Sequence, residues 1–369
     1  MNFDYSEEQT MLRDSVRRYV QDQYSFEARK AFVAAGGFSL AVWAALAELG
    51  VLGLTAPADA GGSEMDSQAA MVVMEELGRG LLMEPVAACA LMPLAILKSL
   101  NHTALAAGIA DGTAPVAVAY LEHAHRYHWH TCSTTSSTTS STTATAQGAG
   151  YVLNGTKGVV AGAAQSPTLI VSAMLAGELA LFAVARDNAT LQPYSTQDGS
   201  AAAEVILVNA KAELLATAQA ATDALQAGVN ALIAANAAEA VGLMEALCDM
   251  TADYLNTRKQ FGTAIGSFQA LRHRLVDMRL ELELARGMSW KANIALSDAA
   301  MPLAEQTAIC SAAKIAQSKA MRAVGQGGVQ LHGGIAVTQE YAAAHYFKRL
   351  TTLEFIGGDR ARHLGLLAA

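Results

Sequence analysis

The sequence predicts a mostly α-helical protein with a central β domain. Hydrophobic residues make up 52% of its 369 residues and charged residues only 16%, with alanine used heavily, which suits closely packed helices. Apolar residues recur at helical spacing in the first third of the chain and again from about Lys211. Short apolar runs separated by Gly, Asp and Asn lie between these regions and indicate strands. We therefore expect an N-terminal α-helical domain over 1–112, a middle β domain over 113–210 and a C-terminal four-helix bundle over 211–369.

The first domain contains three predicted helices. Ser6 and Gln9 have the spacing of a capping box, which predicts a helix that runs through Val20. A second helix is predicted over Ser39–Leu49, ended by Gly50, and a third over Ser67–Leu77.

The middle domain consists of short predicted strands. Val116–Leu121 is typical of a buried strand, and Tyr151–Lys157 of a strand that enters a hairpin-type turn. Further apolar runs complete the set: Leu169–Ala173, Ala180–Val184 and Val205–Val208.

A histidine-rich and Ser/Thr-rich insert separates the first two strands. It holds His123, His125, His128 and His130, followed by the Ser, Thr and Ala tract Ser133–Thr145. Alternate residues of a strand face the same way, so one interpretation is a metal site. No cluster of carboxylates or cysteines completes a set of ligands, so we favour a flexible polar loop and expect no metal.

The last part of the chain is again helical, over Ala221–Leu255, Ser267–Ala295 and Pro302–Val324. With the terminal segment these helices form the expected four-helix bundle. Two glycine pairs, Gly327-Gly328 and Gly333-Gly334, follow. Because glycine costs a helix about 1 kcal/mol relative to alanine, we expect either a bound molecule that approaches the backbone closely or tight packing here.

Composition excludes several classes of function. The net charge of −8 argues against a surface for nucleic acid or anionic lipid. The four cysteines are far apart with no CxxC pair, which favours a reducing compartment. The N-terminus has no signal-peptide pattern, and the longest apolar run, Val86–Leu97, is too short to cross a bilayer. We expect a soluble cytoplasmic protein that does not enter the membrane.

Two motifs carry a resemblance to a known family. The first is the run Arg258–Gly262, followed by Ile265–Gln269, and the second is Val329–Gly334 with Glu340-Tyr341 downstream. Together they resemble the acyl-CoA dehydrogenase family, and the resemblance extends over essentially the whole chain. Weaker similarities lie in Trp43–Leu54, Glu75–Gly78 and Tyr151–Lys157.

The resemblance implies an α domain, a β-barrel-like domain and a four-helix bundle, with FAD between domains and across a subunit interface. The family removes a proton from Cα of an acyl-CoA while hydride leaves Cβ for the flavin. By motif, Arg258 would meet the FAD pyrophosphate, where a guanidinium offers charge and a fixed donor fork. The other implied cofactor contacts, which in the family serve a neighbouring subunit, are Phe261, Gln269, Gln330, Gly333 and Gly334.

The sequence also departs from the family pattern. The position of the usual catalytic glutamate falls on Gly357, and the alternative position for the base falls near Leu232. Aromatic and hydroxyl groups expected beside the flavin ring fall on Val159 and Ala161. The loop that covers the flavin in the family is replaced by the His and Ser/Thr insert.

Three functions remain open from the sequence. The preferred hypothesis is a half-site subunit. Such a chain is similar to the small subunits of two-subunit pimeloyl-CoA or steroid side-chain acyl-CoA dehydrogenases. In a heterotetramer it would complete the ADP side of the FAD site of a larger homologous partner. The alternatives are a self-sufficient, homo-oligomeric dehydrogenase that uses Asp359 or Glu354 as base, and a non-enzymatic assembly subunit without FAD. A carboxylate in an apolar pocket is chemically adequate as the base, whereas Asp359 is also a candidate helix cap or salt-bridge partner. For an active enzyme the resemblance implies an acyl-CoA substrate and an electron-transfer flavoprotein as acceptor.

Overall fold

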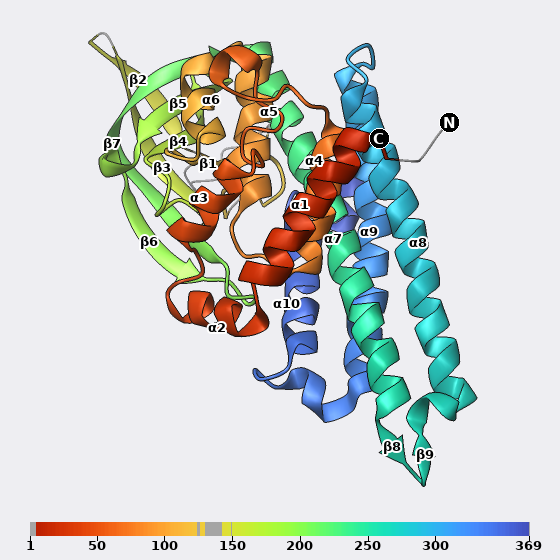
Figure 1. The fold of residues 1–369 in the computed structure, drawn as a ribbon. Helices are drawn as coiled ribbons and strands as arrows, with labels where there is room; N and C mark the ends of the chain where they lie inside the picture. Colours follow the sequence, from red (N-terminus) through yellow and green to blue (C-terminus); the bar gives the residue numbers. More distant parts are fainter. Residues whose placement is uncertain (1–4, 124–125, 130–141, 149, 369) are drawn as a thin grey trace. The chain divides into compact units, whose positions relative to one another are not determined.

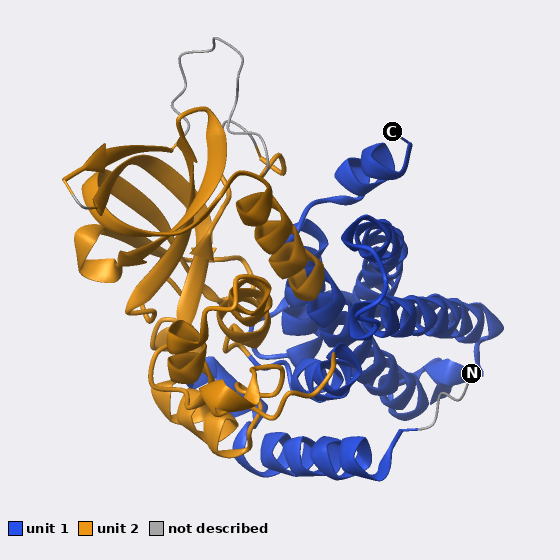
Figure 2. Cartoon of the chain, turned by 90° about the horizontal axis from the view of Figure 1, so that it is seen from above, with its two compact units in different colours: residues 1–31, 67–82, 233–369 blue, residues 32–66, 83–232 orange. Residues whose placement is uncertain are grey.

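A computed structural model describes residues 5–123, 126–129, 142–148 and 150–368 of the chain (Figure 1). Contacts divide the chain into two compact units, coloured in Figure 2: unit 1 comprises residues 1–31, 67–82 and 233–369, and unit 2 comprises residues 32–66 and 83–232. Unit 1 is helical apart from one short hairpin, and unit 2 carries the main sheet. The predicted fold class is confirmed, while the division into three domains stays a prediction.

Unit 1 is built from long helices. Its capping box is present as predicted: Gln9 N donates to Ser6 Oγ at 3.1 Å, and Ser6 N donates to Gln9 Oε1 at 3.0 Å. The helices are α1 (Glu7–Gln23), α4 (Ser67–Arg79), the part of α7 (Ala218–Thr257) from Ile233 onward, α8 (Gln269–Ser297), α9 (Leu303–His332), α10 (Ala342–Phe355) and α11 (Arg360–Ala368). The short strands β8 (Lys259–Gln260) and β9 (Thr263–Ala264) join α7 to α8, and helix α2 (Phe26–Ala34) spans the boundary between the units.

Unit 2 combines helices with the sheet. The helix predicted over Ser39–Leu49 is present as α3 (Leu40–Glu48), with Ser39 as its N-cap. A π-helical turn at Ala87–Leu91 leads into α5 (Met92–Ser99), followed by α6 (Thr103–Ala110). The strands are β1 (Val116–Ala119), β2 (Thr143–Gln147), β3 (Gly150–Ala161), β4 (Thr168–Leu175), β5 (Glu178–Ala185), β6 (Thr190–Ser195) and β7 (Ala201–Thr217).

The sheet of unit 2 closes on itself. Its strand order is β1-β4-β2-β3-β7-β5, with β6 paired to β7. An additional antiparallel pairing of β4 with β5 closes the ring through β2, β3 and β7. Closure removes exposed sheet edges and encloses a core, as in a β-barrel.

Two expectations about the strands are wrong. Strand β3 passes straight through Asn154-Gly155, where a register shift against β7 replaces the expected hairpin turn. The helix expected from Lys211 begins at Ala218, because β7 continues to Thr217 in pairing with β3 and β5. Part of the Ser/Thr tract is also ordered, since Thr143–Gln147 forms strand β2.

The first glycine pair lies at a point of tight packing. Helix α9 extends to His332, so Gly327 and Gly328 lie inside it. A Cβ at either position would approach the side chain of Met278 or Leu247 to 2.9 Å. Of the two expectations, binding or tight packing, the structure shows packing of α9 on its neighbours within unit 1 at this pair.

Helices α4 and α7 make the closest helix contact of the described part of unit 1. A Cβ at Gly78 would overlap the carbonyl oxygen of Glu239, and a Cβ at Gly242 would overlap that of Glu75. Backbone therefore touches backbone at this crossing, which only glycine permits.

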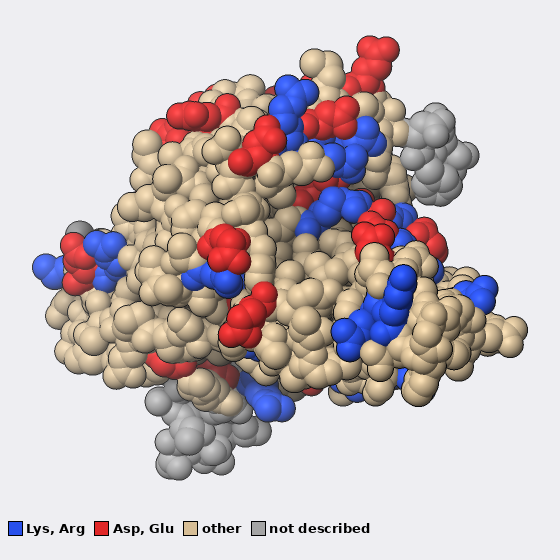
Figure 3. Space-filling model, turned by 60° about the horizontal axis from the view of Figure 1, so that its bottom comes forward, with Lys and Arg blue, Asp and Glu red and all other residues tan. Residues whose placement is uncertain are grey.

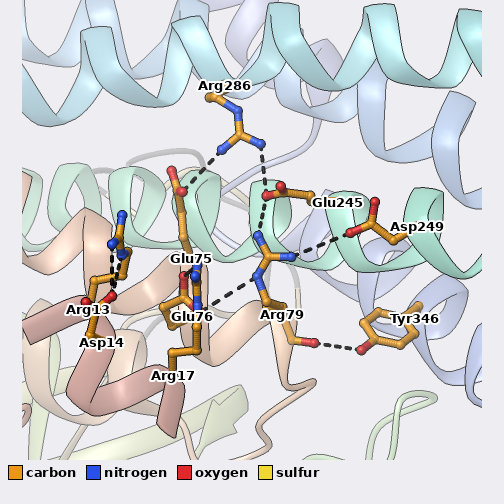
Figure 4. Close-up of polar contacts among 10 residues, drawn as sticks. All are labelled: Arg13, Asp14, Arg17, Glu75, Glu76, Arg79, Glu245, Asp249, Arg286 and Tyr346. Atoms are coloured by element: carbon orange, nitrogen blue, oxygen red, sulfur yellow. Dashed lines mark hydrogen bonds and ion pairs between the residues drawn. The ribbon is translucent and has the colours of Figure 1, made fainter. Parts of the chain in front are cut away.

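A charge network lies beside this crossing and links α1, α4, α7 and α8 (Figure 4). Arg17 donates to both carboxylate oxygens of Glu76, at 2.6 and 2.9 Å. Arg286 bridges Glu75 at 3.3 Å and Glu245 at 3.0 Å. Arg79 also reaches Glu245, and Asp249 joins Arg79 to Arg279. Acids and bases alternate through the network, so each buried charge has an opposite neighbour.

The carboxylate of Glu75 is less well compensated than the other charges of the network. Burial raises its pKa to about 7, although Arg286 lies beside it. Its Oε1 has no hydrogen-bond partner among the described residues. The carboxylate is thus only partly compensated.

Helix α7 is long and apolar enough to span a membrane, but 83% of its most apolar window is buried within the structure, as in the core helix of a globular protein. On the face shown in Figure 3, acidic and basic side chains are intermixed. Cys89, Cys248 and Cys310 are buried thiols that form no disulfide among the described residues, while Cys132 lies outside the described residues.

We predict that Gly242→Ala lowers the free energy of unfolding by about 2 kcal/mol or more, because the new methyl group would overlap the backbone of α4. The matched control is Gly287→Ala in α8, where nothing lies within 4 Å of the added Cβ. This control should stabilise the helix by up to about 1 kcal/mol. Denaturant unfolding of both variants checks the pair, and equal effects would contradict the close crossing.

We predict that Glu75→Gln becomes more stable relative to the parent as pH rises from 4.5 to about 7. A raised carboxyl pKa means that the folded parent must give up a proton it holds more tightly than the unfolded chain does, which costs about 3 kcal/mol in full. Urea unfolding at about pH 5 and about pH 8 measures the difference. Glu283→Gln, an exposed partner of Arg286, is the control, and a pH-independent Glu75→Gln effect would contradict the raised pKa.

Candidate functional site

One end of unit 1 gathers the two motifs noted in the sequence. Helix α7 ends there at Thr257, the β8–β9 hairpin turns, α8 begins at Gln269 and α9 ends at His332 (Figure 1). The 3₁₀ turn η5 (Gly333–Val337) follows directly after α9.

His332 links these segments by side-chain hydrogen bonds to Thr251 and Tyr341. Thr251 Oγ donates to the carbonyl of Leu247, so His332 Nε2 donates to Thr251 Oγ at 3.1 Å. The other ring nitrogen, Nδ1, then accepts from Tyr341 OH at 3.1 Å. Burial lowers the pKa of His332 to about 4, which keeps the ring neutral in this arrangement. The sequence motif contained His332, but its role as a link between helices was not predicted.

The six predicted cofactor contacts lie at this end and are all exposed: Arg258, Phe261, Gln269, Gln330, Gly333 and Gly334. No described atom lies within 4 Å of a Cβ built on Gly333 or Gly334, so their backbone is open to an approaching molecule. The six residues lie on a surface of unit 1. Such a surface can serve a molecule held mainly by another chain.

Phe261 has an unusual conformation in this surface. Its φ of +54° places a bulky residue in the left-handed region, and its side chain is 93% exposed. The ring meets Phe268 edge to face at 6.2 Å. Strain combined with exposure at a hairpin tip is typical of residues that contact a partner or ligand.

The donor set fits FAD chemically. A guanidinium suits a pyrophosphate, side-chain amides suit the polar edges of an adenine nucleotide, and bare glycine backbone admits a flat group. The exposed Phe261 ring offers an aromatic face.

The turn between α10 and α11 lies where a catalytic glutamate was expected. Gly357 and Gly358 adopt φ of +73° and +102°, which disfavours any side chain. A Cβ on Gly357 would lie 2.9 Å from Ile233 Cγ1. The two positions considered for the base, Gly357 and the neighbourhood of Leu232, therefore lie close together, and both are apolar.

Buried polar groups hold this turn. Lys314 Nζ donates to the carbonyls of Leu353 at 2.6 Å and Ile356 at 2.7 Å, and burial lowers the lysine pKa to about 7. His363 Nε2 donates to the carbonyl of Gly357 at 2.9 Å. Its Nδ1 accepts from Ser311 Oγ at 3.1 Å, and burial lowers the pKa of His363 to about 4. Neither Lys314 nor His363 was singled out from the sequence, since a helical lysine or histidine carries no local signal of burial.

Both candidate replacement carboxylates are engaged. Asp359 Oδ1 accepts from the amide of Arg362 at 2.8 Å, which caps the first turn of α11. Glu354 is buried and ion-paired with Arg322. Each contact matches a structural role.

The β domain contains the two positions expected beside a flavin ring. Val159 has φ of +53° and is 52% exposed, and Ala161 accepts a hydrogen bond from the Cys89 thiol at 3.4 Å. Lys157, in the same strand, donates from Nζ to Glu122 Oε1 at 2.6 Å, and both side chains are buried. The described residues contain no group of three or more His, Cys, Asp or Glu side chains that could hold a metal. His125 and His130 lie outside the described residues.

Comparison with known proteins agrees with these features. Residues 6–111 match the family described as acyl-CoA dehydrogenase, N-terminal domain, and residues 221–369 match acyl-CoA dehydrogenase, C-terminal domain. The chain is 30% identical to acyl-CoA dehydrogenase FadE12 of Mycobacterium tuberculosis over 372 residues, which covers 93% of this chain and 90% of the relative.

Two solved structures are similar over nearly the full length. One, described as a variant of the Tcur3481-Tcur3483 steroid ACAD, is 28% identical with a TM-score of 0.85 and covers 98% of this chain and 97% of its own. The other, the ChsE4-ChsE5 complex from Mycobacterium tuberculosis, is 22% identical with a TM-score of 0.88, covers 100% of this chain and 98% of its own, and supports the fold alone. The chain therefore belongs to the acyl-CoA dehydrogenase family, whose members are FAD-dependent oxidoreductases that act on the CH–CH group of acyl-CoA thioesters.

Proposed function

We propose that this chain is the half-site subunit of a heteromeric acyl-CoA dehydrogenase. In this assembly it completes the ADP side of the FAD site of a larger homologous subunit and carries no working base of its own. The observation that carries the proposal is Gly357, which has no side chain at the position expected for the base and whose backbone and packing disfavour one.

The exposed end of unit 1 supports the cofactor role. Arg258 would bind the pyrophosphate of the partner's FAD, with Phe261 and Gln269 along the ADP half. Gln330, Gly333 and Gly334 would receive the flat part of the nucleotide against open backbone. Bound FAD supplies the hydride acceptor for acyl-CoA α,β-desaturation, while this chain binds and orients it.

An apolar stripe on α8 supports a partner of the same fold. Val276, Leu280 and Leu284 are 54%, 59% and 64% exposed and recur every four residues. Gly287 continues the stripe with no atom within 4 Å of its Cβ position. A helix face of this kind is suited to close packing on another helix.

The β domain supports a silent half-site. The pocket beside Val159 has a volume of about 190 Å³, below the range of roughly 300–1,000 Å³ usual for organic ligands. His123 lies on Gly158 at its edge, where the family pattern has the flavin ring.

The names of the similar structures extend the proposal. The steroid ACAD is described with two components, which supports an assembly of this chain with a larger homologous subunit. We propose that the assembly is a heterotetramer. We propose an acyl-CoA of the fatty-acid or steroid side-chain type as substrate, an electron-transfer flavoprotein as acceptor and the cytoplasm as location.

We predict that the chain purified alone is colourless and that flavin absorbance appears only after co-expression with the larger homologous subunit of the same host. In the complex, Arg258→Ala should weaken FAD retention by roughly tenfold or more, because a charge-assisted contact to phosphate is lost. Lys259→Ala, an exposed neighbouring cation, is the control. Equal FAD retention in both variants would contradict the pyrophosphate role, and a colourless complex would favour the assembly subunit without FAD.

Tight FAD and activity in the chain alone would overturn the half-site and favour a self-sufficient enzyme. Asp359→Asn and Glu354→Gln then distinguish the bases. Asparagine still caps α11, so Asp359→Asn should leave the free energy of unfolding within about 0.5 kcal/mol of the parent. Loss of activity in that stable variant would identify Asp359 as the base, and the same loss confined to Glu354→Gln would identify Glu354.

A further inference from the structure

A bulge in β3 shapes a second site in unit 2. Lys157 pairs with Val205 and Val160 with Ala203, so Gly158 and Val159 together oppose Glu204. Val159 is a β-branched residue at φ of +53°, a conformation that costs about 1–3 kcal/mol and persists where surrounding structure holds it. Bulges of this kind redirect side chains and are common beside functional sites.

Gly158 leaves space for the imidazole ring of His123. A Cβ at this position would lie 2.9 Å from His123 Nε2 and 3.0 Å from Cε1. His123 Nε2 lies 2.8 Å from Glu204 Oε2, and Tyr194 OH donates to the other carboxylate oxygen at 3.4 Å. Glycine in the bulge therefore allows Glu204 to hold the ring in a fixed orientation.

The second ring nitrogen of His123 is available. A carboxylate oxygen only accepts, so Nε2 carries the proton of the bond to Glu204. Nδ1 has no hydrogen-bond partner among the described residues, and the side chain is 69% exposed. In the imidazolium form Nδ1 also carries a proton, so the ring would donate this second N–H to a bound group while Glu204 accepts the first.

A guanidinium lies at the same pocket. Arg126 and Tyr127 line the cavity of about 190 Å³ together with His123, Glu122 and Val159. Within the described part of the chain, Arg126 makes no ion pair. Glu122, the acid of the lining, is neutralised by Lys157 at 2.6 Å. The pocket thus combines two open cationic or potentially cationic donors with a compensated acid.

We propose that this pocket binds a small oxyanion between the His123 imidazole and the Arg126 guanidinium. The shared chemistry of the ligand is a phosphate, sulfate or carboxylate group, which accepts charge-assisted hydrogen bonds from both donors. The small volume suits such a group and excludes a drug-sized molecule. Binding requires neither FAD nor a partner subunit, so the site goes beyond the proposed function.

The test is isothermal titration of the isolated full chain with inorganic phosphate, and separately with sulfate and acetate, at constant ionic strength set by chloride. His123→Ala and Arg126→Ala should each weaken phosphate binding by roughly tenfold or more. His128→Ala is the matched control, because His128 is an exposed histidine of the same insert that does not line the pocket. Acetate binding with no phosphate or sulfate binding would assign the site to carboxylates.

The proposal is overturned if none of the three anions binds in the millimolar range, or if His128→Ala weakens binding as much as His123→Ala does. Circular dichroism of each variant excludes unfolding as the cause, and His123→Gln, which keeps one N–H donor, should retain part of the affinity. Because flavin retention is measured on the co-expressed complex, failure here leaves the half-site proposal intact.

Discussion

The contact between α4 and α7 sets the spacing on which the helical unit depends. At Gly78 and Gly242 the two backbones meet without intervening side chains. This proximity brings Glu75 and Glu76 of α4 within reach of arginines and acids from α1, α7 and α8. A wider crossing of α4 and α7 would separate the ion-pair partners. The charges would then be buried without an opposite charge nearby, which destabilises the folded state more than the intact ion pairs stabilise it. The ionic network therefore depends on the glycines. They allow the backbones of α4 and α7 to approach closely, and this brings the charged side chains within ion-pairing distance.

The same helices carry the two contrasting regions on which the proposed half-site rests. The hairpin and the end of α9 offer exposed donors, open glycine backbone and a strained, solvent-facing phenylalanine. The turn after α10 is buried and clamped by Lys314 and His363. If the whole region had lost its function, we would expect the exposed cofactor contacts and the position of the base to be lost together. Retention of outward-facing contacts beside a closed inner turn is consistent with a chain that acts on a cofactor outside itself.

Local patterns predicted most of the helices and the family, while the loss of the base at Gly357 stays a prediction. The Ser6 capping box, the Ser39 cap and the long apolar helices follow from short-range chemistry that is visible in sequence. Tertiary pairing explains the failures. Asn154-Gly155 has the composition of a turn, yet pairing with β7 keeps it in a strand, and Gly327-Gly328 lies inside a helix because Met278 and Leu247 need the space. The buried roles of Lys314, His332 and His363 depend on residues far away in the chain and have no local signature.

In the proposed half-site, more than one residue disfavours a base at Gly357. A glutamate there would need a left-handed backbone at φ of +73°, and its Cβ would press on Ile233. Straightening the backbone would break the bond from His363 to the Gly357 carbonyl and disturb the carbonyls that Lys314 satisfies. These groups are buried, so each lost bond would leave a polar atom without water to replace it. The contacts of the turn therefore hold Gly357 in a conformation that disfavours a side chain. The nearby carboxylates make structural contacts, Asp359 as a helix cap and Glu354 as an ion-pair partner.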